Sequence, residues 1–178
     1  NTQLVPNTGA ALALAGSGGA RTLVVTPTAN RSGTATITVT VSDGSLSASR
    51  TFTLTVNAVN DAPTLTRTPA SGTIANGLVA HTGVTITDID TAGSSLLLTA
   101  TSSNTTLLPN ANIAVTATNT TATSRTFDVA MTPAPGQAGT ATVTLSGSDG
   151  VAPVSATYTL TVTVPVPPTI TAIGAQSV

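Results

Sequence analysis

Apolar and polar residues alternate along two neighbouring stretches in the first third of the chain. Every second position is aliphatic or aromatic: Ala35, Ile37, Val39 and Val41 in the first stretch, and Phe52, Leu54 and Val56 in the second. Because successive side chains of a strand point to opposite faces, each stretch predicts a strand with one buried and one solvated face. Between them, Asp43-Gly44 supplies the positive φ angles of a tight turn. The segment therefore predicts a β-hairpin.

The same pattern returns in the last third of the chain. Three segments repeat the hairpin: Gly139–Leu145 the first strand, Ser148-Asp149-Gly150 the turn, and Thr157–Val162 the second strand. Further matches pair Asn1–Asn7 with Asn104–Asn110, and Pro168-Thr169-Ile170 with Pro63-Thr64-Leu65. Repetition at this spacing indicates tandem domains, since about 100 residues is the usual size of a β-sandwich.

This repeat divides the chain into three parts. We expect residues 1–61 to be the carboxy-terminal part of a first immunoglobulin-like (Ig-like) repeat and residues 62–164 to be a complete repeat. Residues 165–178 are expected to be a proline-rich linker and the opening strand of a third repeat. Because the sequence has neither an initiator Met nor a signal peptide, we expect a piece of a longer protein.

Seven strands are predicted in the complete repeat. They are Thr64–Thr68, Val84–Thr87, Leu96–Ala100, Ile113–Thr118, Arg125–Met131, Thr140–Leu145 and Thr157–Val164. Short strands separated by regular turn signals predict an all-β fold of tandem Ig-like, or cadherin-like, seven-strand antiparallel sandwiches. In the first repeat, short strands are predicted at Leu4-Val5-Pro6, at Ala10–Ala15 and at Arg21–Thr26. The Cys-Trp-Cys core of antibody domains is absent, which points away from that class.

The composition excludes several classes of partner. Only 6% of residues are charged and the net charge is −1, so electrostatics gives no reason to bind nucleic acid or an anionic membrane. The apolar runs are shorter than the roughly 20 residues that a membrane-spanning helix needs. The absence of cysteine excludes disulfides and thiolate metal sites.

The hairpin motif, the Asn-Asp-Ala-Pro-Thr linker at 60–64 and Ile-Thr-Asp-Ile-Asp-Thr at 86–91 resemble the cadherin-like or Ig-like tandem repeats of large bacterial surface and secreted proteins. The resemblance covers nearly the whole chain. It implies an extracellular or cell-surface location and a structural role in a stalk, adhesin or fibre. The implied partners are neighbouring repeats or identical subunits joined end to end.

Carboxylates are expected to meet at one pole of the complete repeat. Asn60 and Asp61 lie in the linker, Asp88 and Asp90 follow the second strand, and Asp149 lies in the last hairpin turn. Oxygen ligands of this kind suit Ca²⁺, and the cadherin resemblance implies interdomain calcium at such linkers, although no Glu ligand is present. The alternative is that each Asp merely accepts backbone amide bonds in its own turn.

No enzyme motif is found. His81 is the only histidine and is predicted to lie in an exposed loop, and there is neither a nucleophile elbow nor a glycine-rich phosphate loop. Asp128 is predicted to face solvent near Arg125, and Met131 to lie in the core. Asn and Thr side chains, including Asn30, Asn104 and Asn119 in glycosylation sequons, are possible glycan sites.

Two functions remain open at this stage. The first is a non-enzymatic structural module of a long extracellular protein. The second is a self-assembling, pilus-like filament subunit, in which the opening strand at 168–178 completes another chain by donor-strand complementation. A carbohydrate-binding module is disfavoured, because Tyr158 and both phenylalanines alternate inward.

Overall fold

The computed structural model describes residues 1–164 and residue 169. The chain divides into two compact units, residues 1–60 and residues 61–178. The opening strand predicted at 168–178 lies outside the described residues, apart from Thr169. Among the residues that the structure describes, no helix combines the length and apolar character needed to cross a membrane.

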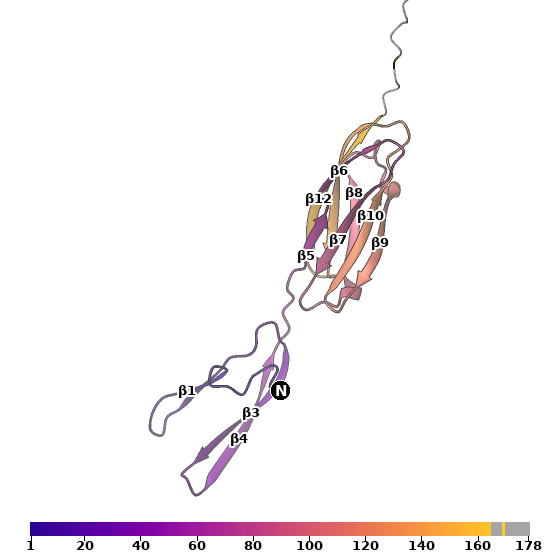
Figure 1. Cartoon of the computed structure of the whole chain (residues 1–178). Coiled ribbons are helices and arrows are strands. Elements are labelled where there is room, and N and C mark those ends of the chain that lie inside the picture. Colours follow the sequence, from indigo (N-terminus) through magenta and orange to yellow (C-terminus); the bar gives the residue numbers. More distant parts are fainter. Residues whose placement is uncertain (165–168, 170–178) are drawn as a thin grey trace, which may run out of the picture. The chain divides into compact units, whose positions relative to one another are not determined.

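The second unit is a sandwich of two four-stranded sheets (Figure 1). One sheet has the order β5-β7-β10-β9 and the other β6-β12-β11-β8. The strands are β5 (Thr64–Thr68), β6 (Ser71–Ala75), β7 (Ala80–Thr87), β8 (Leu97–Ser102), β9 (Ile113–Thr120), β10 (Ser124–Met131), β11 (Gly139–Ser148) and β12 (Pro153–Thr163). Two short 3₁₀ helices, Gly93–Ser95 and Asn110–Asn112, precede β8 and β9.

The prediction of seven antiparallel strands missed β6. This strand pairs in parallel with β12, from Ser71 opposite Thr159 to Ala75 opposite Thr163. Its sequence, Ser-Gly-Thr-Ile-Ala, is only five residues long and contains a glycine, so periodicity does not reveal it. Gly72 is needed there, because a β-carbon at this position would collide with the Tyr158 hydroxyl.

The core of the second unit is built from the inward positions of the alternating strands. Tyr158, Leu160 and Val162 of β12 are buried against the inward residues of β11, β7 and β10. Met131 is fully buried, as the sequence predicts. Aliphatic residues supply most of this packing, at about 25 cal/mol per Å² of apolar surface removed from water.

The first unit contains two separate two-stranded sheets. In one, β1 (Leu12–Ala15) pairs with β2 (Thr22–Val25), and in the other β3 (Gly33–Ser42) pairs with β4 (Ser47–Val56). The predicted hairpin is thus confirmed. The small core of the first unit consists of Leu4, Val5, Ala11, Ala35 and Ile37.

The strand predicted at Leu4-Val5-Pro6 is wrong, because this segment forms a turn. The Asn1 side chain holds the turn: its oxygen accepts the Leu4 N–H at 3.1 Å, and its amide donates to the Thr34 carbonyl at 3.1 Å. Asn104 makes the same two bonds in the second unit, to Leu107 and Thr140. The repeat therefore extends to individual hydrogen bonds.

Candidate functional site

Strand pairing brings three of the predicted loops to one end of the second unit. Thr64 at the start of β5 lies opposite Thr87, so the linker and the loop after β7 are neighbours. Ser148 at the end of β11 lies opposite Leu97, at the end of that same loop. Asp61, Asp88, Asp90 and Asp149 therefore occupy one pole. Asn60 belongs to the other compact unit.

Asp88 is the buried member of this group, with only 2% of its surface exposed. Its backbone N–H donates to the Thr123 carbonyl at 2.9 Å, which ties the loop to the turn before β10. Oδ1 accepts the N–H groups of Asp90 at 2.9 Å and Thr91 at 2.7 Å. Oδ2 is buried and receives no hydrogen bond from an N–H or hydroxyl donor. An acceptor left in this state is costly, so it calls for a proton or a cation.

Asp90 faces Asp88 and is held by the linker. Its Oδ2 accepts the Asp61 backbone N–H at 3.0 Å. A hydrogen bond shared with the Asp88 carboxylate raises the pKa of Asp90. Burial opposes ionisation of Asp88, but hydrogen bonds from the Asp90 side chain, from the Thr91 and Asp90 amides and from the Thr91 side chain outweigh it, so the pKa of Asp88 is lowered. The two carboxyls therefore share one proton more readily than two separate aspartates would.

A pocket adjoins the buried carboxylate. It is lined by Ala62, Thr64, Thr87, Asp88, Ile89 and Thr123. These residues come from the linker, the edge of β5, the end of β7 and the turn before β10. The pocket gives a ligand access to Asp88 from solvent, although the side chain itself is almost fully covered.

Asp149 plays a local role in its hairpin turn. Its Oδ1 accepts the N–H groups of Val151 at 2.7 Å and Ala152 at 2.6 Å. Asp43 accepts the corresponding bonds from Ser45 and Leu46 in the first unit, and these amides lower the pKa of Asp43. Within the described part of the chain, no three His, Cys, Asp or Glu side chains are grouped as metal ligands.

His81 lies on strand β7 and not in a loop, which corrects the sequence prediction. It is exposed, as expected, and its Nδ1 lies 2.9 Å from Asp128 Oδ2 on the neighbouring strand β10. Arg125 was the expected neighbour of Asp128, but its guanidinium instead lies 5.2 Å from the Phe127 ring centre and donates to the Leu96 carbonyl. The exposed pair of His81 and Asp128 contributes little to stability.

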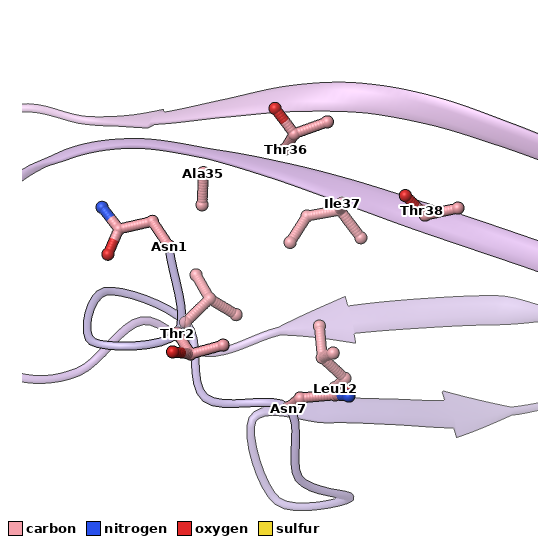
Figure 2. Close-up of a pocket in the computed structure, with 9 residues that line it drawn as sticks. Asn1, Thr2, Asn7, Leu12, Ala35, Thr36, Ile37 and Thr38 are labelled. Carbon is pink, nitrogen blue, oxygen red and sulfur yellow. The ribbon is translucent and has the colours of Figure 1, made fainter.

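A second candidate site is a groove in the first unit that is lined by both apolar and polar residues. Its walls are β3 and the segment leading into β1, as Figure 2 shows for Ile37, Leu12 and Asn7. A neighbouring depression continues it along Ile37–Thr40 and over Leu14 and Leu23.

Two packed sheets with this strand order define the second unit as an Ig-like β-sandwich, and the all-β prediction is confirmed. Residues 2–57 match the family model described as "Bacterial Ig domain". This match confirms the resemblance to bacterial Ig-like repeats, and it falls within the first unit. No curated protein matches the sequence.

Several solved structures are similar to the chain. The surface layer protein SbsC, domains 1–6, is 21% identical over 89% of this chain and 19% of that chain, with a TM-score of 0.44. An endo-fucoidan hydrolase from glycoside hydrolase family 107 is 17% identical over 87% of this chain and 22% of that one, with a TM-score of 0.43. The BIgI domain of the beta protein from S. agalactiae, solved bound to CEACAM1, is 19% identical over 58% of this chain and 98% of that chain, with a TM-score of 0.41. The chain thus spans about a fifth of the first two proteins.

Proposed function

We propose that the chain is a non-enzymatic structural module of a long bacterial surface or secreted protein, acting in a stalk or adhesin. In this proposal residues 62–164 are a complete repeat and residues 1–61 are the later part of the preceding one. The repeated Asn1 and Asn104 hydrogen bonds support that assignment. The family match over residues 2–57 supports a bacterial Ig-like module.

The parallel pairing of β6 with β12 is the observation that carries this proposal. Thr64 lies at the linker end of the second unit, whereas Thr163 lies opposite Ala75 at the other end. Tension between the two ends pulls β6 and β12 in opposite directions along their own axes. At one end of this pairing the Thr159 N–H donates to the Ala70 carbonyl at 3.3 Å, and at the other end the Asn76 N–H donates to the Thr163 carbonyl at 2.7 Å. The hydrogen bonds between the two strands must then break together. This loading in shear suits a module that transmits force.

Single-molecule pulling tests this role. Because the chain has no cysteine, handles can be attached at V59C and V164C, two exposed positions that flank the second unit. A control pair, Q137C and V164C, loads the β11–β12 hairpin from its open end, where Gly139 lies opposite Val162. We expect a clearly higher unfolding force for the flanking pair, since the control breaks hydrogen bonds one after another. Equal forces in both geometries would contradict the load-bearing role.

We further propose that the pole carrying Asp88 and Asp90 binds Ca²⁺. The supporting observation is the buried Asp88 Oδ2, which has no N–H or hydroxyl donor and adjoins a pocket open to solvent. Carboxylate and backbone oxygens are suitable ligands, and bound Ca²⁺ would supply the positive charge that this oxygen lacks. Asp61 and Asp149, which belong to the same unit, remain predicted members of the ligand set.

Calorimetric titration of the whole chain with CaCl₂ tests this site. We expect binding in the range of about 10⁻⁴–10⁻³ M, typical of extracellular calcium modules. Asp88→Asn is expected to abolish the heat, because it removes the buried charge and keeps the side-chain shape. Asp128→Asn, on the outer face of the sheet, is the matched control and should bind as the unmodified chain does. Absence of binding heat at millimolar calcium would exclude the site.

Self-assembly into an end-to-end filament is the second candidate function. The observation in its favour is that, among the residues that the structure describes, β3 pairs only with β4 and borders a groove lined by apolar and polar residues. Exposed edges of this kind accept strands from other chains. Sedimentation velocity over a wide concentration range tests it: growing species support a filament, and a single slow boundary throughout excludes one.

A further inference from the structure

The turn that follows β6 contains Asn76-Gly77, the only place in the sequence where glycine follows asparagine. The Leu78 N–H donates to the Ala75 carbonyl at 3.2 Å, and Gly77 has a φ of 91°. A turn that closes in this way, with a positive φ at its third residue, is of type II and favours glycine at that position. The backbone of the turn therefore accounts for the glycine after Asn76.

The Asn76 side chain makes three hydrogen bonds to the loop between β10 and β11. Its Nδ2 donates to the carbonyls of Ala134 at 2.9 Å and Gln137 at 2.8 Å, and its Oδ1 accepts the Gly136 N–H at 3.0 Å. Both amide hydrogens are thus used. The Asn76 backbone N–H also donates to the Thr163 carbonyl at 2.7 Å. We call these bonds the Asn76 clamp, because they tie the end of β6 to the loop and to the end of β12.

An Asn-Gly pair is also the sequence in which asparagine loses its side-chain amide most readily, since glycine has no β-carbon to hinder its own nitrogen. In this reaction the Gly77 nitrogen bonds to Asn76 Cγ, its proton passes through water to Nδ2, and the Cγ–Nδ2 bond breaks to release ammonia. Water then opens the succinimide ring at either carbonyl, which leaves aspartate or isoaspartate at position 76. Gly77 is exposed, so water reaches this site.

We infer that Asn76 is a site of deamidation and that the Asn76 clamp controls its rate. Nδ2 cannot leave as ammonia while its hydrogens are bonded to Ala134 and Gln137, so the reaction requires the clamp to open. Breaking three hydrogen bonds slows such a local opening by about 10–1,000-fold. The clamp cannot close again in the same way, because a carboxylate at position 76 has no hydrogen to donate to these carbonyls. The site depends on neither the stalk role nor calcium binding.

Peptide mapping by mass spectrometry, on the full chain incubated at neutral pH, measures the reaction. We expect Asn76 to deamidate about tenfold or more slowly in the chain than in a synthetic peptide of residues 71–81. Asn112 is the internal control. Its Nδ2 donates to the Thr132 carbonyl at 3.0 Å, but Ile113 follows it, and a β-branched side chain hinders the attacking nitrogen. Asn112 should therefore stay unmodified while Asn76 converts.

Two variants of the loop between β10 and β11 test the control by the clamp. Gly136→Pro removes the N–H that Asn76 accepts, and proline cannot adopt the φ of 73° found there, so the rate should approach that of the peptide. Gln137→Ala keeps the main-chain carbonyl that Nδ2 uses, and its rate should stay within about threefold of the unmodified chain. Equal rates in the unmodified chain and the peptide would overturn the control by the clamp. An Asn76 that stays intact in both the unmodified chain and Gly136→Pro would overturn the site.

Asn76→Asp supplies a second measurement, which does not depend on how Gly136→Pro folds. This variant has the product of the reaction in place and lacks both donors of the clamp. We expect it to lower the urea midpoint of the second unit, followed by the fluorescence of Tyr158. Asn119→Asp adds the same charge at an exposed position of β9 and should leave the midpoint unchanged. Equal midpoints for the two variants would overturn the clamp.

Discussion

Leu160→Ala is expected to lower the free energy of unfolding of the second unit by about 2–5 kcal/mol. Leu160 is fully buried in β12, among Tyr158, Val162 and the inward residues of β11. Truncation removes apolar area from the core and leaves a cavity that the two sheets cannot close, because both are held by long hydrogen-bonded ladders. Equilibrium urea unfolding, followed by the fluorescence of Tyr158, measures the effect, since Tyr158 is the only tyrosine and there is no tryptophan.

Leu54 offers a control with the same chemistry. It occupies the matching position of β4, opposite Ala35, just as Leu160 lies opposite Ala141. Leu54 is only partly buried, because the first unit presents two-stranded sheets where the second presents four-stranded ones. We therefore expect Leu54→Ala to cost about 1 kcal/mol or less, measured by circular dichroism. Equal losses for the two variants would mean that the covering sheets contribute little.

The hairpins show what sequence periodicity predicts well. Strands β3, β4, β11 and β12 follow directly from strict alternation, since one solvated face demands polar residues at every second position. Exposure does not follow from alternation, because it depends on what covers the inward face. Phe52 and Tyr158 occupy equivalent positions, yet only the second is buried.

The burial of Asp88 is a feature of the candidate site that the sequence alone does not predict. Asp88 and Asp149 both follow a strand and both accept two backbone amides, so local sequence does not separate them. The difference arises from tertiary packing, because the turn before β10 closes over Asp88 and accepts its N–H through Thr123. A buried oxygen without a donor can be recognised only once that covering turn is placed.

Gly93→Ala is the second variant expected to have a large effect, with a loss of about 1–3 kcal/mol or more in the stability of the second unit. Gly93 is buried at the start of the first 3₁₀ helix and donates its N–H to the Ala122 carbonyl at 3.0 Å. A β-carbon there would overlap the backbone carbonyl oxygens of Thr121 and Ser124. These are backbone atoms of the turn after β9 and of the first residue of β10, so a side-chain rotation cannot relieve the overlap.

Gly83→Ala separates this overlap from the general effect of replacing glycine. Gly83 lies exposed on β7, and a β-carbon would meet only the Thr68 carbonyl oxygen at 3.5 Å, an ordinary contact. We expect its stability to change by no more than about 0.5 kcal/mol. Because the same turn covers Asp88, Gly93→Ala should also weaken any calcium binding at that pole, whereas Gly83→Ala should not. Unchanged stability of Gly93→Ala would mean that the turn between β9 and β10 does not pack on Gly93 as described.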